Sequence, residues 1–199
     1  MIANHIHDAL AQVKTLQEMI LDKRLFKGYS GTARIAAGLI ALAGAAAIAS
    51  SGLVPRTPYY HLLGWGAVLL VALILNYGAL VWWFLFDPHV RGDLSMMRPA
   101  MDAVPPLAVG AALSLALILQ NDFDLLFGVW MCNYGLVHCA HRHNLPKQIY
   151  FTGLFYLACG GFCLLSPSVR FLNPWPMGIV FCTGELLGGI ILLKNKEES

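Results

Sequence analysis

Long apolar stretches separated by short polar segments make up most of the chain after residue 32. Six of these stretches have roughly the 17 to 25 residues that a helix needs to cross the hydrocarbon core of a bilayer. They cover about residues 33–51, 60–86, 99–120, 125–141, 149–165 and 177–193. The pattern predicts an all-α fold, a polytopic membrane bundle of six transmembrane helices.

The first 30 residues have a different pattern, in which apolar positions recur every three or four residues. Ile6, Leu10, Val13, Leu16 and Ile20 would therefore line one face of a helix. We expect residues 1–30 to hold a cytoplasmic amphipathic helix, followed by a membrane domain over residues 31–199. The helix could lie on the membrane or the bundle, form a short coiled coil, or bind a cytoplasmic protein partner through residues 2–26.

Composition supports a lipid environment, because 58% of the 199 residues are hydrophobic and 12% are charged. In soluble domains about a quarter of the residues carry charge. The apolar stretches leave no room for a separate soluble catalytic domain, and a net charge of +2 is too small to imply a nucleic-acid partner. The lipid bilayer is the partner that composition predicts.

Lysine and arginine are distributed unevenly among the connecting segments, and short basic segments stay in the cytoplasm. If both termini are cytoplasmic, eleven basic residues lie inside and two, Arg56 and Arg170, lie outside. The inner set is Lys14, Lys23, Arg24, Lys27, Arg34, Arg91, Arg98, Arg142, Lys147, Lys194 and Lys196. The asymmetry predicts a multi-pass protein of the inner (cytoplasmic) membrane with both its N- and C-termini in the cytoplasm.

A weak internal repeat accompanies this topology. The sequence Asn76-Tyr77-Gly78 in the second stretch recurs as Asn133-Tyr134-Gly135 in the fourth, and the sixth carries the looser Thr183-Gly184-Glu185. Three parallel helical hairpins would explain the recurrence, as would the abundance of small residues. The repeat predicts an intramembrane polar site made of Glu185, Asn76, Asn133, Tyr77 and Tyr134.

Glu185 is the acidic residue deepest in a predicted span, where a charged side chain costs about 2.5 to 3.5 kcal/mol. It must face the interior of the bundle with partners or keep its proton. One interpretation makes it a group that handles protons or binds cations in a carrier. The other makes it a hydrogen-bonded joint between helices, and a Glu185→Gln variant separates the two.

A second group of polar residues, His138, Cys139, His141 and His143, ends the fourth stretch at the cytoplasmic boundary. Helical spacing could let these side chains share zinc or copper, although His and Arg at this depth ordinarily meet headgroups and water. A haem would need two facing histidines at matched depth. His138 is the only candidate within a span, because His61 lies at the opposite face, and an absorption spectrum tests the idea. No cofactor is predicted, with zinc, copper and haem kept as alternatives.

The stretch Pro105–Leu113, followed by Asp124–Trp130 and Tyr134-Gly135, resembles a group of small uncharacterised bacterial multi-spanning inner-membrane proteins. The resemblance brings no activity or site residues. The chain carries no phosphate-binding loop, dinucleotide fingerprint or hydrolase motif, which disfavours an enzyme. Two functions remain: a regulatory or scaffold protein that presents its N-terminal helix to a partner, or a carrier or channel, alone or as a homo-oligomer, for protons, metal ions or a small solute.

Overall fold

The computed structural model describes residues 12–13, 26, 28–50, 57–88, 90, 101–141 and 144–197. The bounded elements in this part of the chain are six α-helices and one short 3-10 helix, with no strand. They are α2 (Gly31–Ser50), α3 (Pro58–Phe86), α5 (Val104–Gln120), η2 (Phe123–Leu125), α6 (Leu126–Ala140), α7 (Lys147–Leu165) and α8 (Trp175–Glu197). The predicted all-helical fold class is confirmed for these residues.

Four helices, α2, α3, α7 and α8, are long and apolar enough to cross a membrane. α5 is apolar but has 17 residues, and α6 has 15 residues that continue directly from η2. The amphipathic helix predicted within residues 1–30 falls largely outside the described residues. Within it, Gln12 and Val13 are helical, and Phe26 is buried.

Local signals in the sequence explain where α3 begins and where α5 ends. Thr57 caps the start of α3, where its side chain accepts a hydrogen bond from the Tyr60 amide at 3.4 Å and Pro58 needs no backbone partner. α5 ends at Asn121, which adopts a left-handed conformation with φ 63° and ψ 23°. Asparagine tolerates this conformation better than most residues, and the chain turns directly into η2.

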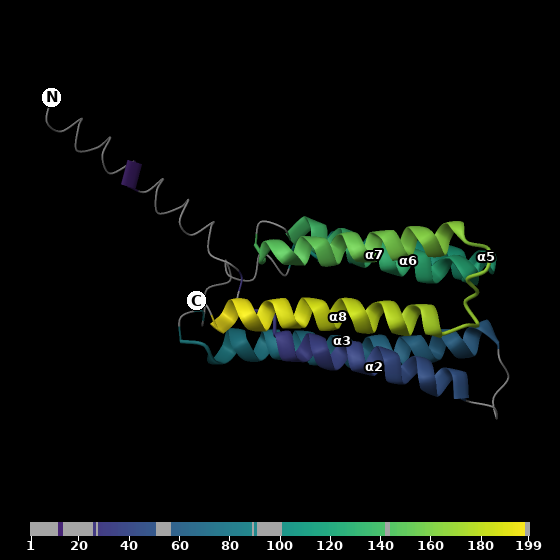
Figure 1. Cartoon of the computed structure of the whole chain (residues 1–199), viewed down its shortest axis with the longest axis horizontal. Coiled ribbons are helices and arrows are strands. Elements are labelled where there is room, and N and C mark those ends of the chain that lie inside the picture. Colours follow the sequence, from purple (N-terminus) through teal and green to yellow (C-terminus); the bar gives the residue numbers. More distant parts are fainter. Residues whose placement is uncertain are drawn as a thin grey trace, which may run out of the picture.

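The helices are arranged in two layers, one made of α2, α3 and α8 and the other of α5, α6 and α7 (Figure 1). The closest packing joins α2 to α8 and α6 to α7. Glycines allow both approaches: a Cβ atom on Gly38 would lie 3.1 Å from the Cys182 carbonyl oxygen, and one on Gly160 would lie 2.7 Å from the Cys132 amide. The predicted repeat pairs consecutive spans into hairpins. The two most closely packed pairs, α2 with α8 and α6 with α7, therefore each combine helices from different hairpins.

Two apolar clusters connect the layers at opposite ends of the bundle. The proximal cluster lies where α2 begins and α8 ends, and the distal cluster lies where α7 connects to α8. The proximal cluster contains Phe26, Leu80, Leu145, Ile149 and Leu192. The distal cluster contains Ala45, Ile48, Trp65, Phe123, Leu126, Phe127, Met131, Cys163, Phe171 and Met177.

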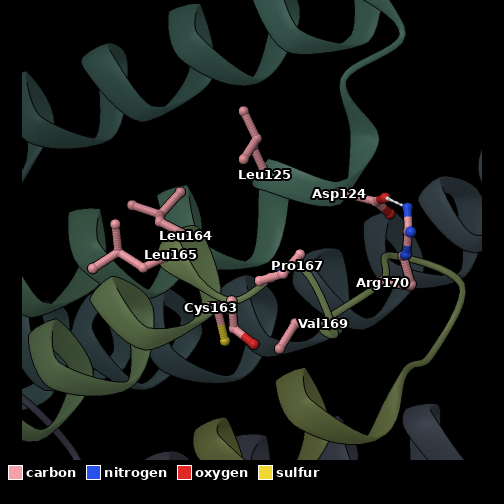
Figure 2. Close-up of a pocket in the computed structure, with 9 residues that line it drawn as sticks. Asp124, Leu125, Cys163, Leu164, Leu165, Pro167, Val169 and Arg170 are labelled. Atoms are coloured by element: carbon pink, nitrogen blue, oxygen red, sulfur yellow. Dashed lines mark hydrogen bonds and ion pairs between the residues drawn. The ribbon is translucent and has the colours of Figure 1, made fainter.

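Asp124, next to the distal cluster, fixes the connection between α7 and α8. Its carboxylate accepts hydrogen bonds from the Phe171 amide at 2.8 Å and from Arg170 at 2.9 Å. Figure 2 shows this ion pair at the edge of a surface pocket of about 410 Å³, lined also by Cys163, Leu164 and Pro167. The contact places Phe171 against Phe127, with ring centroids 4.9 Å apart.

We expect Asp124→Ala to lower the free energy of unfolding by about 1 kcal/mol, because the Phe171 amide loses its acceptor. Arg170→Gln should cost less than about 0.5 kcal/mol, since the ion-paired side chains of Arg170 and Asp124 are 69% and 45% exposed. Thermal unfolding in detergent micelles measures both. Equal losses for the two variants would contradict the role given to the backbone contact.

Candidate functional site

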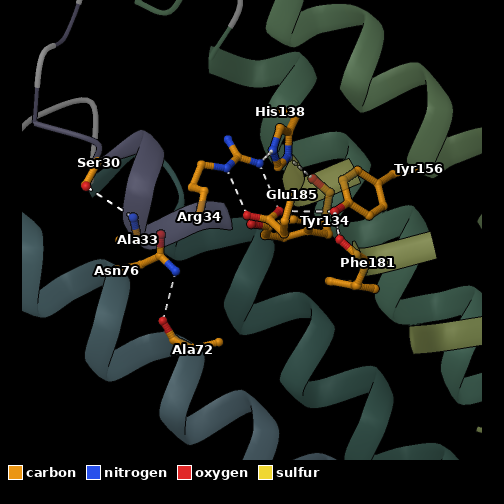
Figure 3. A network of polar contacts seen from close by, with 10 residues as sticks. All are labelled: Ser30, Ala33, Arg34, Ala72, Asn76, Tyr134, His138, Tyr156, Phe181 and Glu185. Carbon is orange, nitrogen blue, oxygen red and sulfur yellow. Dashed lines mark hydrogen bonds and ion pairs between the residues drawn. The ribbon is translucent and has the colours of Figure 1, made fainter. Parts of the chain in front are cut away.

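A buried ion pair joins α2 to α8. Arg34 donates from Nε to Glu185 Oε2 and from Nη2 to Glu185 Oε1, each at 2.9 Å (Figure 3). Arg34 is 6% exposed and Glu185 is 3% exposed. A two-point contact between a guanidinium and a carboxylate is the strongest geometry available to such a pair, and it fixes the orientation of both groups.

Glycines make room for this pair. A Cβ atom on Gly188 would lie 2.8 Å from the Arg34 guanidinium carbon, and one on Gly38 would lie 2.8 Å from the Glu185 Cβ. The guanidinium therefore lies directly over the backbone of α8. Glu185 is nine residues before Lys194, or about 13 Å along the helix, so the pair sits well inside the bundle.

His138 reaches the pair from α6, in the other layer. Its Nε2 lies 2.6 Å from Arg34 Nη2, and its Nδ1 lies 2.8 Å from the Tyr134 carbonyl oxygen. Because a guanidinium only donates and a carbonyl only accepts, His138 is a neutral imidazole that carries its hydrogen on Nδ1. The histidine thus adds an acceptor for Arg34 and no further charge.

Two tyrosines complete the surroundings of the carboxylate. Tyr156 of α7 is fully buried, and its hydroxyl donates to Glu185 Oε1 at 3.1 Å. Tyr134 lies beside Glu185, with its ring centroid 4.5 Å from that of His138 and 5.1 Å from that of Tyr156. We call Arg34, Glu185, His138, Tyr134 and Tyr156 the interlayer site, because α2 and α8 supply the ion pair and α6 and α7 cover it.

Comparisons with protein-family models, curated proteins and solved structures find no match. The site contains one positive and one negative side chain, so the pair has no net charge. Hydrogen bonds from both layers hold the pair, and aromatic rings cover it.

Of the five residues predicted for an intramembrane polar site, Glu185 and Tyr134 belong to the interlayer site. Asn76 donates to the Ala72 carbonyl oxygen of its own helix at 2.9 Å. Asn133 packs against Gly110 of α5, and Tyr77 on α3 is 39% exposed. The structure therefore does not gather the two asparagines around the acid.

The residues predicted as metal ligands have other contacts. Both ring nitrogens of His138 take part in hydrogen bonds, His141 Nδ1 lies 2.7 Å from the Val137 carbonyl oxygen, and Cys139 packs over Gly153. In the part of the chain that the structure describes, no three His, Cys, Asp or Glu side chains lie close enough to share a metal. His143 lies outside that part, so the zinc and copper alternatives stay predictions, as does the haem alternative.

Arg34 and Tyr156 are the site residues that the sequence interpretation misses. The charge pattern groups Arg34 with the basic residues at the cytoplasmic boundary, although it falls one residue inside the first predicted span. A glycine near each charged residue is the sequence signal that could have indicated the Arg34–Glu185 pair. Gly38 follows Arg34 by one turn, and Gly188 follows Glu185 by three residues. Such positions let a long side chain cross onto a neighbouring helix.

Proposed function

We propose that this protein is a small carrier of the bacterial inner membrane and that its interlayer site binds the transported solute. One observation supports this function above the others. The only buried ion pair among the described residues lies between two layers of helices, with an apolar cluster toward each end of the bundle. A polar site closed on both sides is the occluded arrangement that alternating access requires.

The packing of α2 against α8 supports a topology with both termini on one side. Gly31 of α2 meets Gly189 and Leu193 of α8, while Gly178, at the other end of α8, meets Ala45. The first and last described helices are therefore antiparallel, as an even number of crossings requires. We include α5 and the η2–α6 segment as crossings, which gives six, with the termini in the cytoplasm as the basic residues predict.

Each layer contains one pair of helices whose backbones meet at glycines, α2 with α8 and α6 with α7, whereas between the layers the main direct helix contact is that of α7 with α8. We therefore expect each layer to move as a unit. Separating the layers at the proximal cluster would open the interlayer site to one side of the membrane. Separating them at the distal cluster would open it to the other side.

Labelling of position 181 tests this carrier mechanism. The Phe181 ring of α8 faces the other layer, with its centroid 5.3 Å from that of Tyr134 and 5.1 Å from that of Tyr156. In a Phe181→Cys variant without the native cysteines, a membrane-impermeant thiosulfonate should modify position 181 from either face of reconstituted vesicles. Modification from neither face, with full modification after denaturation, would exclude alternating access.

A single-cysteine variant that keeps Cys132 is the matched control. Cys132 lies at the glycine contact between α6 and α7, inside one layer, and its thiol donates to the Leu157 carbonyl oxygen at 3.9 Å. Separation of the layers leaves this contact intact. We therefore expect Cys132 to stay protected from both faces under conditions that modify position 181 in the Phe181→Cys variant.

The scaffold function stays a prediction, because residues 2–26 lie largely outside the described part of the chain. Phe26 is the described residue that ties this segment to the bundle: its amide donates to the Asn144 carbonyl oxygen at 2.7 Å, and its ring packs against Trp83. Deleting residues 2–25 keeps this contact. A carrier should retain two-sided labelling of position 181 in the Phe181→Cys variant after the deletion, whereas a scaffold should lose a co-purifying partner.

A further inference from the structure

We propose that the solute is a small monocarboxylate and that it crosses together with one proton. This inference rests on the proposed carrier function and names the chemical class of its cargo. It follows from three properties of the interlayer site: the group that Arg34 holds, the charge balance of the pair, and the aromatic residues around it.

The Glu185 side chain already shows which group the site recognises. Its carboxylate receives two hydrogen bonds from Arg34 and one from the Tyr156 hydroxyl. The planar, two-point edge of a guanidinium matches the two oxygens of a carboxylate. A free carboxylate that takes the place of Glu185 would find the same three donors, so no new recognition group is needed.

Charge balance determines what must accompany that carboxylate. In the closed state Arg34 carries +1, Glu185 carries −1, and His138 is neutral, so the site has no net charge. If a proton binds Glu185 and breaks the pair, Arg34 is left as a buried, unpaired cation, which is strongly unfavourable. If one monoanion binds Arg34 at the same time, the net charge returns to zero, and the cargo as a whole is neutral.

The groups that hydrogen-bond to the pair do not supply a second charge. Arg34 comes from α2, His138 and Tyr134 come from α6, and Tyr156 comes from α7. Toward the proximal end, His141 and Tyr29 pack edge to face, with ring centroids 6.1 Å apart. Burial raises the pKa of Tyr29 to about 12, so this phenol stays neutral at physiological pH.

The aromatic surroundings favour a small anion with a short apolar body. The rings of Tyr134 and Phe181 are stacked with centroids 5.3 Å apart, and the ring of Tyr156 lies 5.1 Å from that of Phe181. A Cβ atom on Gly184 would overlap the Tyr156 ring. Beside the carboxylate, the site therefore offers aromatic surfaces and no second cation among the residues that contact it, which disfavours dicarboxylates, phosphate and sulfate.

Rescue of a Glu185→Ala variant by acetate tests the binding class separately from transport. The variant lacks the internal carboxylate, so acetate at about 100 times its dissociation constant should raise the Tm by roughly 5 °C or more. Sulfate at equal ionic strength should not. The matched control is the double variant Arg34→Gln/Glu185→Ala, for which acetate should produce no shift. An equal shift in both variants, or none in Glu185→Ala, would overturn the assignment.

Uptake by the unmodified protein keeps the inference testable if Glu185→Ala does not fold. Liposomes that contain the full chain and an internal pH dye should accumulate labelled pyruvate when the outside is made acidic. One proton should enter per pyruvate, and clamping the membrane potential with potassium and valinomycin should not change the rate. Arg34→Gln should reduce uptake to that of empty liposomes.

The two proposals fail in different ways. If position 181 is modified from both faces in the Phe181→Cys variant but neither acetate rescue nor pyruvate uptake occurs, the protein is a carrier with a different cargo. If position 181 is protected from both faces and pyruvate uptake is absent, the carrier function itself is wrong. Uptake that carries net charge would overturn the coupling to one proton.

Discussion

Glu185→Gln is expected to lower the free energy of unfolding by about 3 to 5 kcal/mol. The substitution preserves the shape of the side chain but leaves the Arg34 guanidinium buried without a counter-ion. His138 and Tyr156 cannot compensate, because His138 offers one neutral acceptor and the Tyr156 hydroxyl is a donor to Glu185. Thermal or SDS-induced unfolding in detergent, in chloride buffer free of carboxylates, measures the loss.

The double variant Arg34→Gln/Glu185→Gln provides the control for this prediction. Removing both charges removes the cost of burying them, so its stability should return to within about 1 kcal/mol of the original chain. Carboxylate binding should be lost, because the guanidinium is gone. If Glu185→Gln alone is as stable as the original chain, the pair is not excluded from water and the charge-balance argument fails.

Gly160→Ala is expected to separate α6 from α7 and to cost about 1 to 3 kcal/mol. The added methyl would lie 2.7 Å from the Cys132 amide and 2.9 Å from the Gly128 carbonyl oxygen. Both are backbone atoms of α6, so they cannot move aside without shifting the helix. The free energy of unfolding in detergent is again the measurement.

Gly161 provides a matched control on the same helix. A Cβ atom at Gly161 meets no other atom within 4 Å. Gly161→Ala should therefore leave the stability unchanged or raise it by up to about 1 kcal/mol, since alanine favours the helix. A similar loss in both variants would mean that helix propensity, and not the contact between α6 and α7, determines the effect.

The helices could be predicted from the sequence because lipid-spanning segments have a simple requirement, an unbroken apolar run of sufficient length. The predicted span over residues 60–86 agrees closely with α3, Pro58–Phe86, and the span over residues 149–165 with α7, Lys147–Leu165. Which helices pack together was harder to predict. The pairing of α2 with α8 depends on glycines far apart in the chain, and the repeat pattern favoured sequential hairpins instead.

The candidate site was predicted only in part, for a related reason. Glu185 could be found because an acid inside a span needs an explanation. Its partner could not, because Arg34 is 151 positions away and also fits the expected pattern of basic residues at a membrane boundary. Asn76 and Asn133 share a motif, yet a motif does not fix the direction of a side chain, and each asparagine contacts other groups.

The distance along the chain between Arg34 and Glu185 also matters while the protein is being synthesised. Ribosomes add about 5 to 20 residues per second, so the 151 positions between the two take roughly 8 to 30 s to translate. During that time Arg34, in the first turn of the first apolar helix, can extend its guanidinium to the headgroups. Its carboxylate partner is supplied only by α8, so a chain truncated before α8 would leave this arginine without its counter-ion.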